Sequence, residues 1–318
     1  MTTLDAVHSA CVFFDCGDRG KIEADGSEAA VFLHNLSTND IKGLAPGTGC
    51  EAFFCTATAK LLAHGWVWRE PPEGKRDRFW LDLAPGLGEK MYGHLDRYLI
   101  SEDVTLTDQT ALLGQLHLVG PRAADVLLAA GFHPLQPWSR ASFRGAIRCT
   151  DPLGIPGYDL LFPAGEASTI RDGLLAAGAI AGDPVTWDIL RLEAGLPVFG
   201  LDMDETTFAP EVNRTATAIS YHKGCYLGQE PIVMARDRGV VQRFLVGLRS
   251  SDLLARGNLL FRDGKEIGRV TSSVVSPGLG PIALGYIRRG NQAPGTSVEV
   301  EQNGVRLPAT VQGLPFAK

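Results

Sequence analysis

Apolar and polar residues follow one kind of pattern up to about residue 240 and another kind beyond it. Before that point, short apolar runs typical of strands are interspersed with segments whose apolar residues recur every three or four positions, as in amphipathic helices. Such a mixture predicts an α+β fold. Strands are predicted at 11–15, 52–62, 66–68, 79–81, 104–107, 114–119, 143–149 and 159–162, and helices at 27–36, 89–99, 120–131, 167–177 and 183–195.

Capping residues support several of these helices. Ser27 is a candidate N-cap for the helix at 27–36, and Asp183 followed by proline is a typical helix start. A hairpin is expected to join the strands at 66–68 and 79–81. Its tip, residues 70–77, carries both signs of charge, which indicates a solvated turn rather than a binding patch.

Beyond residue 240, short strands are separated by turns rich in glycine, proline and asparagine. This pattern predicts a small antiparallel barrel or sandwich. We therefore divide the chain into an α+β region of two lobes, residues 1–240, and a β domain, residues 241–318. The six strands are predicted at 244–248, 259–261, 267–271, 283–287, 297–300 and 309–311.

Composition excludes several classes of protein. The 318 residues are 45% hydrophobic and 21% charged, as in an ordinary globular protein. A net charge of −6 argues against a broad nucleic-acid surface, although a local basic pocket for a polyanionic ligand is compatible with it. The six cysteines are scattered, unlike a secreted disulfide scaffold, and no targeting signal or apolar run of about 20 residues is present. We expect a cytoplasmic protein with reduced thiols and no nucleic-acid or membrane partner.

The most specific candidate chemistry lies in the segment Lys-Gly-Cys-Tyr-Leu-Gly-Gln-Glu, residues 223–230. A nearby lysine favours the thiolate form of a cysteine, and the flanking glycines permit close approach of a ligand or another backbone. A buried cysteine that packs as a small hydrophobe is the common alternative, but no apolar periodicity surrounds Cys225. We expect a functional, partly exposed thiol whose thiolate fraction is raised by Lys223. Gln229 and Glu230 are expected to position the loop by hydrogen bonds.

The sequence leaves the chemical role of Cys225 open between a nucleophile, a redox thiol and a transient cluster contact. A strand is predicted at 218–221, just before the motif. Because the β domain follows soon afterwards, the motif should lie in a loop at a junction between lobes, where ligand channels form.

Two further groups are candidates for ligand binding. Glu193 is predicted in the last turn of its helix, where the macrodipole disfavours an anion. Either a salt bridge with a distant arginine or a ligand with paired N–H donors, such as a pterin, would compensate. Arg236, Arg238 and Arg243 form either a solvated charge cluster or a channel for the carboxylates of an anionic ligand.

No metal site is predicted. The acidic loop at 200–211 lacks the ligand spacing and the glycine of an EF-hand. The pairs Cys11/Cys16 and Cys50/Cys55 have a spacing outside the usual zinc pattern and lie in strand-like segments. The glycines at 47 and 49 lack the lysine and hydroxyl residue that complete a phosphate loop.

The cysteine motif resembles the signature of the YgfZ/IBA57 proteins, folate-binding relatives of the glycine-cleavage aminomethyltransferase that support iron–sulfur cluster proteins. Four other parts of the chain resemble segments of these proteins and occur in the same order along the sequence: residues 36–40, residues 118–121, the helix end with Glu193, and residues 270–272. The resemblance implies a ring-like arrangement of α+β lobes around a central channel, completed by a C-terminal antiparallel β-barrel. It also implies that Glu193 contacts the pterin of tetrahydrofolate, with Arg236 and Arg238 near the glutamate tail. We expect a monomer that binds folate and contacts iron–sulfur assembly or client proteins.

Two positions depart from the patterns of these families. The aminomethyltransferase has an aspartate near the reactive folate nitrogen, and Met91 takes that place here, with Glu89 nearby. A thioether cannot relay a proton. Met234 stands where an arginine is common. The missing carboxylate, together with Cys225, favours an iron–sulfur maintenance factor over the alternative, a tetrahydrofolate-dependent aminomethyl- or methyltransferase.

Overall fold

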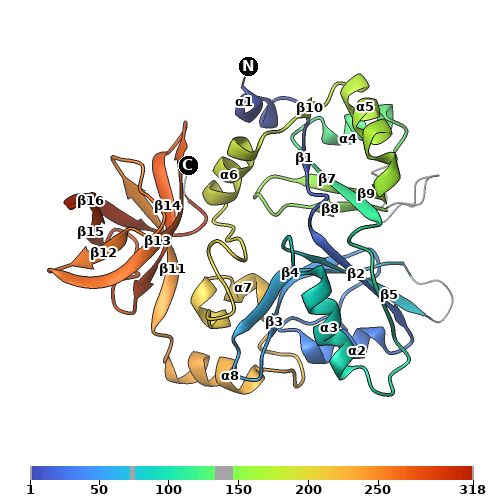
Figure 1. Cartoon of the computed structure of the whole chain (residues 1–318), viewed down its shortest axis with the longest axis horizontal. Helices are drawn as coiled ribbons and strands as arrows, with labels where there is room; N and C mark the ends of the chain where they lie inside the picture. Colours follow the sequence, from blue (N-terminus) through green and yellow to red (C-terminus); the bar gives the residue numbers. More distant parts are fainter. Residues whose placement is uncertain (1, 72–75, 133–145, 317–318) are drawn as a thin grey trace. The chain divides into compact units, whose positions relative to one another are not determined.

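The computed structural model describes residues 2–71, 76–132 and 146–316, which form two compact units (Figure 1). Unit 1 comprises Met1–Phe54, Ala63–Trp187 and His222–Tyr226. Unit 2 comprises Cys55–Leu62, Asp188–Tyr221 and Leu227–Lys318. The five residues around Cys225 therefore belong to unit 1, although the chain on both sides of them belongs to unit 2.

The first sheet of unit 1 has the strand order β10-β1-β7-β9-β8. Its pairs are antiparallel except β1–β10, which is parallel. Phe13, Leu118 and Leu160 lie in an apolar cluster that the sheet shares with two helices, α4 and α5. The elements are β1 (Val12–Asp15), β7 (Leu113–Val119), β8 (Ala146–Thr150), β9 (Gly157–Pro163), β10 (Ile180–Ala181), α4 (Ala123–Ala129) and α5 (Ala167–Ala176).

The second sheet of unit 1 has the order β3-β4-β5-β2-β6, with α2 and α3 packed against β2 and its neighbours (Figure 1). Alternate residues of β5 differ in character: Phe79, Leu81 and Leu83 are fully buried, whereas Asp82 between them is charged. The elements are α1 (Thr3–Val7), β2 (Gly20–Gly26), α2 (Ala29–Leu36), β3 (Gly49–Cys55), β4 (Leu61–Arg69), β5 (Asp77–Leu83), α3 (Gly88–Tyr98) and β6 (Thr105–Asp108).

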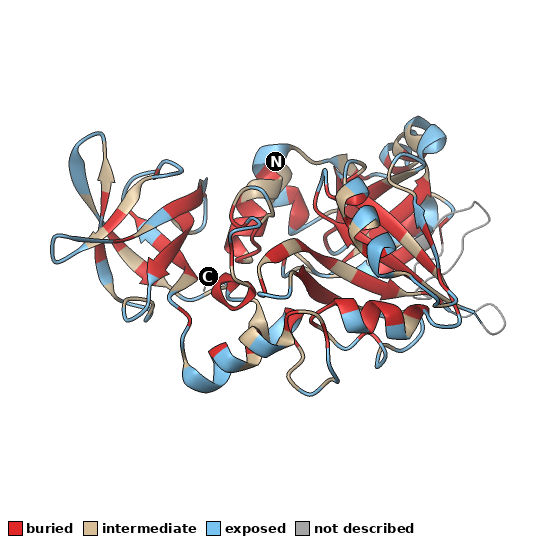
Figure 2. Cartoon of the chain, turned by 60° about the horizontal axis from the view of Figure 1, so that its bottom comes forward, coloured by how far each residue is buried: buried red, intermediate tan, exposed pale blue. Residues whose placement is uncertain are grey.

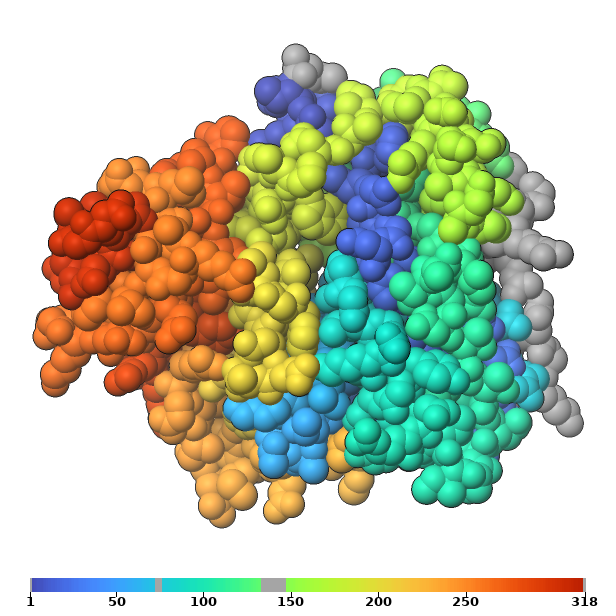
Figure 3. Space-filling view, viewed as in Figure 1, coloured from blue at the N-terminus to red at the C-terminus, as the bar shows by residue number. Residues whose placement is uncertain are grey.

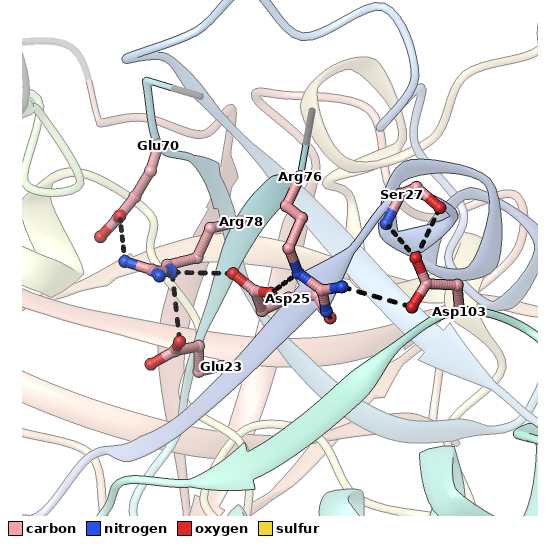
Figure 4. Close-up of polar contacts among 7 residues, drawn as sticks. All are labelled: Glu23, Asp25, Ser27, Glu70, Arg76, Arg78 and Asp103. Carbon is pink, nitrogen blue, oxygen red and sulfur yellow. Dashed lines mark hydrogen bonds and ion pairs between the residues drawn. The ribbon is translucent and has the colours of Figure 1, made fainter. Parts of the chain in front are cut away.

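Ion pairs connect β2 and β5 with the segment before β6, as Figure 4 shows for Glu23, Asp25, Glu70, Arg76, Arg78 and Asp103. Glu70 and Arg76 belong to the predicted hairpin tip, residues 70–77, of which residues 72–75 lie outside the described residues. Ser27 donates its backbone N–H and its hydroxyl to Asp103 (3.2 and 2.7 Å). The prediction that Ser27 caps α2 is wrong, because the hydroxyl is used by Asp103 and the N-cap residue is Glu28.

Unit 2 contains a closed six-stranded barrel in the order β11-β14-β13-β12-β15-β16. Its interior is filled by apolar side chains such as Leu248, Leu260, Ile287 and Val300, and Figure 2 shows buried residues along its strands. The strands are β11 (Arg243–Ser250), β12 (Leu259–Arg262), β13 (Lys265–Ser276), β14 (Gly280–Arg288), β15 (Ser297–Gln302) and β16 (Val305–Gln312). The chain before the barrel forms α6 (Pro184–Glu193), the 3-10 helix η2 (Ala209–Val212), α7 (Thr215–Ala218) and α8 (Gln229–Arg238).

The predicted α+β class and the C-terminal barrel are confirmed, and each of the six predicted barrel strands is present. Asp183 caps α6 as predicted, because its Oδ1 accepts the Thr186 N–H at 2.8 Å. The single strand predicted at 52–62 is wrong: the chain turns between β3 and β4, with Ala59 in the left-handed region. Residues 143–145 of the strand predicted at 143–149 lie outside the described residues. Among the helices that the structure describes, none is long and apolar enough to cross a membrane.

Candidate functional site

Cys225 is an exposed free thiol within the 222–226 segment of unit 1. The strand predicted just before it is wrong. Residues 215–218 form the helical turn α7, closed by the Ala218 N–H on the Arg214 carbonyl at 2.8 Å, and residues 219–221 have no regular structure. Cys225 and Gly224 are both exposed, whereas Tyr226, the next residue, is only 7% exposed.

Lys223 points its ammonium group at the end of helix α2. Its Nζ donates to the carbonyl oxygens of His34, Ser37 (2.7 Å) and Asn39 (2.8 Å). Nζ also lies 4.7 Å from the ring centroid of Tyr226, a cation–π distance. These partners could not be predicted from the sequence, because they lie more than 180 residues before Lys223 in the chain.

Burial sets the protonation behaviour of this lysine. Desolvation lowers the pKa of Lys223 to about 7, while the charges of Asp40 and Cys50 act in the opposite direction. Burial also raises the pKa of the Cys50 thiol to about 12. That Lys223 raises the thiolate fraction of Cys225 stays a prediction, since the described contacts of Nζ are with carbonyls and with an aromatic ring.

The two glycines around Cys225 have different surroundings. Gly228 has φ +84°, and a Cβ added there would lie 2.6 Å from the carbonyl oxygen of Thr56. A side chain at that position would therefore be strained and would overlap the backbone. A Cβ added at Gly224 would meet nothing within 4 Å. Only Gly228 is required by the local backbone, and Gly224 leaves open space beside the thiol.

Gln229 and Glu230 are the first two residues of helix α8 rather than part of a loop, which corrects the expected setting of these two side chains. Gln229 is half-buried and Glu230 is exposed. A glutamate followed by Pro231 just after a glycine is a helix-start signal that the sequence analysis missed. Glu230 suits this place because the N-terminal end of a helix favours an anion.

Arg236 and Arg238 lie in the last turn of α8 and are exposed, and Figure 3 shows this helix at the surface of the face in view. Arg236 donates to Asp237 at 2.7 Å, and its guanidinium carbon lies 4.8 Å from the ring centroid of Tyr221. No carboxylate partner of Arg238 is found among the described residues. Of the arginines predicted to meet a folate tail, Arg238 is thus the one without a competing carboxylate in the described part of the chain.

Arg243 begins the barrel and is already engaged. Its Nε donates to Glu211 at 2.9 Å, and its guanidinium lies 4.7 Å from the ring centroid of Tyr286. A ligand carboxylate would have to compete with Glu211 for this arginine. Glu211 and the buried Asp202 account for two acids of the loop at 200–211 as structural groups.

Glu193 is the last residue of α6, as predicted, and is 8% exposed. Its Oε1 accepts the hydroxyl of Ser276, at the end of β13, at 2.6 Å. This contact could not be predicted from the sequence, because Ser276 lies 83 residues after Glu193. A carboxylate is the acceptor that matches the paired N–H donors of a heterocycle.

The end of α6 is fixed by a buried polar network. Arg191 donates to Asp202 at 3.0 Å and to Ser272 at 3.2 Å, and both Thr271 and Ser272 donate to Asp202 (2.6 and 2.5 Å). Arg191 and Asp202 are both nearly inaccessible to solvent. This network joins the helix that carries Glu193 to β13, so the position of Glu193 is held within unit 2.

Met91 lies on the buried face of α3 and is fully inaccessible. Glu89, two residues earlier, is exposed. Residues two apart on a helix do not share a face, so the Glu89 carboxylate does not point where the Met91 side chain points. Glu89 therefore does not take the place of an aspartate at position 91.

Two family models match the sequence. The GCVT N-terminal domain matches residues 2–145, and the Glycine cleavage T-protein C-terminal barrel domain matches residues 243–318. The "Probable aminomethyltransferase" of Natronomonas pharaonis is 31% identical over 99% of this chain and 90% of its own length. The "Aminomethyltransferase" of Geobacillus kaustophilus is 29% identical over 98% of this chain and 88% of its own length.

A barrel of this type behind an α+β region defines an aminomethyltransferase-like protein. The chain belongs to the glycine cleavage T-protein family. A solved structure, the glycine cleavage system aminomethyltransferase T from Bartonella henselae, has the same fold, with a TM-score of 0.90 over 99% of this chain and 88% of that chain at 24% identity.

Proposed function

We propose that this protein is a tetrahydrofolate-binding member of the YgfZ/IBA57 branch that supports assembly or repair of iron–sulfur cluster proteins through Cys225. The observation that carries the proposal is an exposed thiol at Cys225 on a segment held by the half-buried Lys223 and the buried Tyr226. A cysteine with only a packing role would be buried. An exposed thiol on an anchored backbone suits a group that meets a partner molecule.

Folate binding is supported by the family and by the setting of Glu193. Family members bear the name aminomethyltransferase, and the resemblance attributes pterin contact to this glutamate. The carboxylate of Glu193 lies at the end of α6, where it accepts the Ser276 hydroxyl, and a carboxylate is the acceptor that matches paired N–H donors. When bound, tetrahydrofolate would supply one-carbon chemistry or act as a binding partner. Glu193 would hold its pterin N–H groups, and Arg238 would meet a carboxylate of its tail.

An aminomethyl- or methyltransferase that uses tetrahydrofolate is the second candidate, favoured by the names of the relatives. The buried Met91 and the outward Glu89 count against it, because neither of them places a carboxylate on the buried face of that turn. Formation of methylene-tetrahydrofolate from a methylamine-type donor would favour the transferase.

Calorimetry with tetrahydrofolate tests the binding half of the proposal. Glu193→Gln removes the charge and replaces one acceptor oxygen with an amide, so affinity is expected to fall about 10- to 100-fold, the equivalent of ~1.5–3 kcal/mol. Asp188→Asn, on the exposed face of the same helix, is the matched control and keeps parental affinity. Absence of binding by the parent, or equal affinity in Glu193→Gln, contradicts the proposal.

Deletion of the gene in its host tests the cellular role. Activities of iron–sulfur enzymes are expected to fall and to recover with the parental gene, but not with Cys225→Ser. Assays of enzymes without clusters in the same extracts are the control. Normal cluster enzymes in the deletion strain, or full recovery with Cys225→Ser, would contradict the maintenance role. Monomeric state, contact with iron–sulfur proteins and a cytoplasmic location belong to the same proposal.

A further inference from the structure

Helix α2 ends without the left-handed glycine that closes many helices. Its C-cap residue, Ser37, is extended, with φ −124° and ψ 161°. The last four carbonyls of a helix have no N–H partner within it and need other donors. Ser37 Oγ donates to the Leu33 carbonyl at 2.8 Å, and Lys223 Nζ donates to the His34 carbonyl. Two side chains therefore supply hydrogen-bond donors that a backbone cap would supply in other helices.

The other two carbonyls that Lys223 contacts belong to a backbone that is fixed independently of the lysine. The Thr38 N–H donates to the Phe53 carbonyl at 3.0 Å, and the Phe53 N–H donates to Thr38 Oγ1 at 2.9 Å. The Asn39 amide donates to the Glu51 carbonyl at 2.7 Å. Strand β3 thus holds residues 37–39 in place, so the three carbonyls form a preformed acceptor cage for a cation.

The ammonium group of Lys223 is saturated in this cage. A lysine has three N–H donors and no acceptor, and here each donor has a carbonyl. The C-terminal end of a helix favours a cation, and the ring of Tyr226 offers its face on the same segment. Lys223 and Tyr226 face inward, whereas Gly224 and Cys225 between them are exposed. The thiol is therefore carried on a short stretch that is anchored on each side.

We propose that Lys223 is a positioning residue for Cys225: its tethered ammonium holds the 222–226 segment on the end of α2 and fixes where the thiol is presented. The functional half of this inference rests on the proposed role of Cys225, and the structural half does not. The alternative role for the same contacts is that Lys223 only caps α2. The two roles differ in whether the covalent link between the ammonium and the 222–226 backbone matters.

Chemical rescue separates the two roles. Lys223→Ala removes the side chain beyond Cβ, and free n-propylammonium replaces the missing atoms without a link to the chain. In Lys223→Ala, amide hydrogen exchange is expected to quicken about tenfold or more both at the end of α2 and in 222–226. Added n-propylammonium should restore protection at the end of α2. It should leave 222–226 fast-exchanging and should leave iron–sulfur enzyme activity unrecovered in the deletion strain.

Lys42→Ala is the matched control, because Lys42 is an exposed lysine whose charge also acts on His34. This variant should exchange and complement like the parent. The inference is overturned if Lys223→Ala leaves exchange in 222–226 at the parental rate, or if free n-propylammonium restores complementation. Full complementation by Cys225→Ser would instead remove the proposed function, and the exchange result for 222–226 would still decide the structural half.

Discussion

Removal of the Asp202 carboxylate is predicted to be the most damaging single change in the polar network under Glu193. Asp202 accepts four hydrogen bonds, from Arg191, Thr271, Ser272 and the Val198 N–H. Asp202→Ala would leave the Arg191 charge buried with its main counter-ion gone. Removal of one partner of a buried ion pair costs about 3–5 kcal/mol. Four hydrogen bonds at about 1 kcal/mol each give a similar figure.

The same arginine supplies the control. Asp188 also accepts from Arg191, at 2.6 Å, but its side chain is 51% exposed. An exposed pair of this kind contributes about 0.2–1 kcal/mol, so Asp188→Ala should cost much less than Asp202→Ala. Urea unfolding followed by tryptophan fluorescence measures both changes as shifts of the midpoint at constant slope. In an Arg191→Met background the cost of Asp202→Ala should shrink, because the stranded charge is absent. Equal costs for Asp202→Ala and Asp188→Ala in the parent would refute the reasoning.

Three further predictions follow from the setting of the cysteine motif. Peptide mapping after alkylation of the native protein should find Cys225 labelled first and Cys149, the other exposed cysteine, next. Burial raises the pKa of Cys149 and of the four other thiols, so faster labelling of any buried cysteine would contradict this prediction. Gly228→Ala should lower the free energy of unfolding by more than about 1 kcal/mol, because it forces an alanine in the left-handed conformation against the backbone. Gly224→Ala should be nearly neutral, and equal effects of the two changes in urea titrations would argue against this prediction. Burial lowers the pKa of Lys223 to about 7, so on raising the pH the folded protein loses this proton before the unfolded chain does. The free energy of unfolding of the parent should therefore rise from neutral toward alkaline pH relative to that of Lys223→Met, and parallel pH profiles of the two proteins would refute this prediction.

The barrel could be predicted from the sequence because each strand is short and bounded by turn residues that only a few backbone conformations accept. Helix α8 could not be found by periodicity, because it lies at the surface and only Ile232 and Ala235 are buried in it. A helix with so narrow an apolar stripe gives almost no periodic signal. Its start was nevertheless marked by a glutamate and a proline after Gly228.

Cysteine, lysine and glutamate candidates could be singled out by residue type, but their contacts could not. Lys223 meets carbonyls that precede it by 184–189 residues, and Glu193 meets a serine 83 residues later. Backbone carbonyls leave no trace in a sequence, since each residue has one. The prediction for Ser27 was wrong because its acceptor, the Asp103 carboxylate, is 76 residues away in the chain.

The closed barrel also has a consequence for how this chain tolerates shortening. Every barrel strand has a neighbour on both sides, and β16 completes the circle through its pairs with β11 and β15. A stop codon before Val305 would remove β16 and leave two open strand edges whose N–H and C=O groups lack partners. Such edges recruit other chains. Truncated products should therefore self-associate instead of persisting as smaller folded proteins. A fused tag or domain should be attached after Phe316, which follows the end of β16 at Gln312.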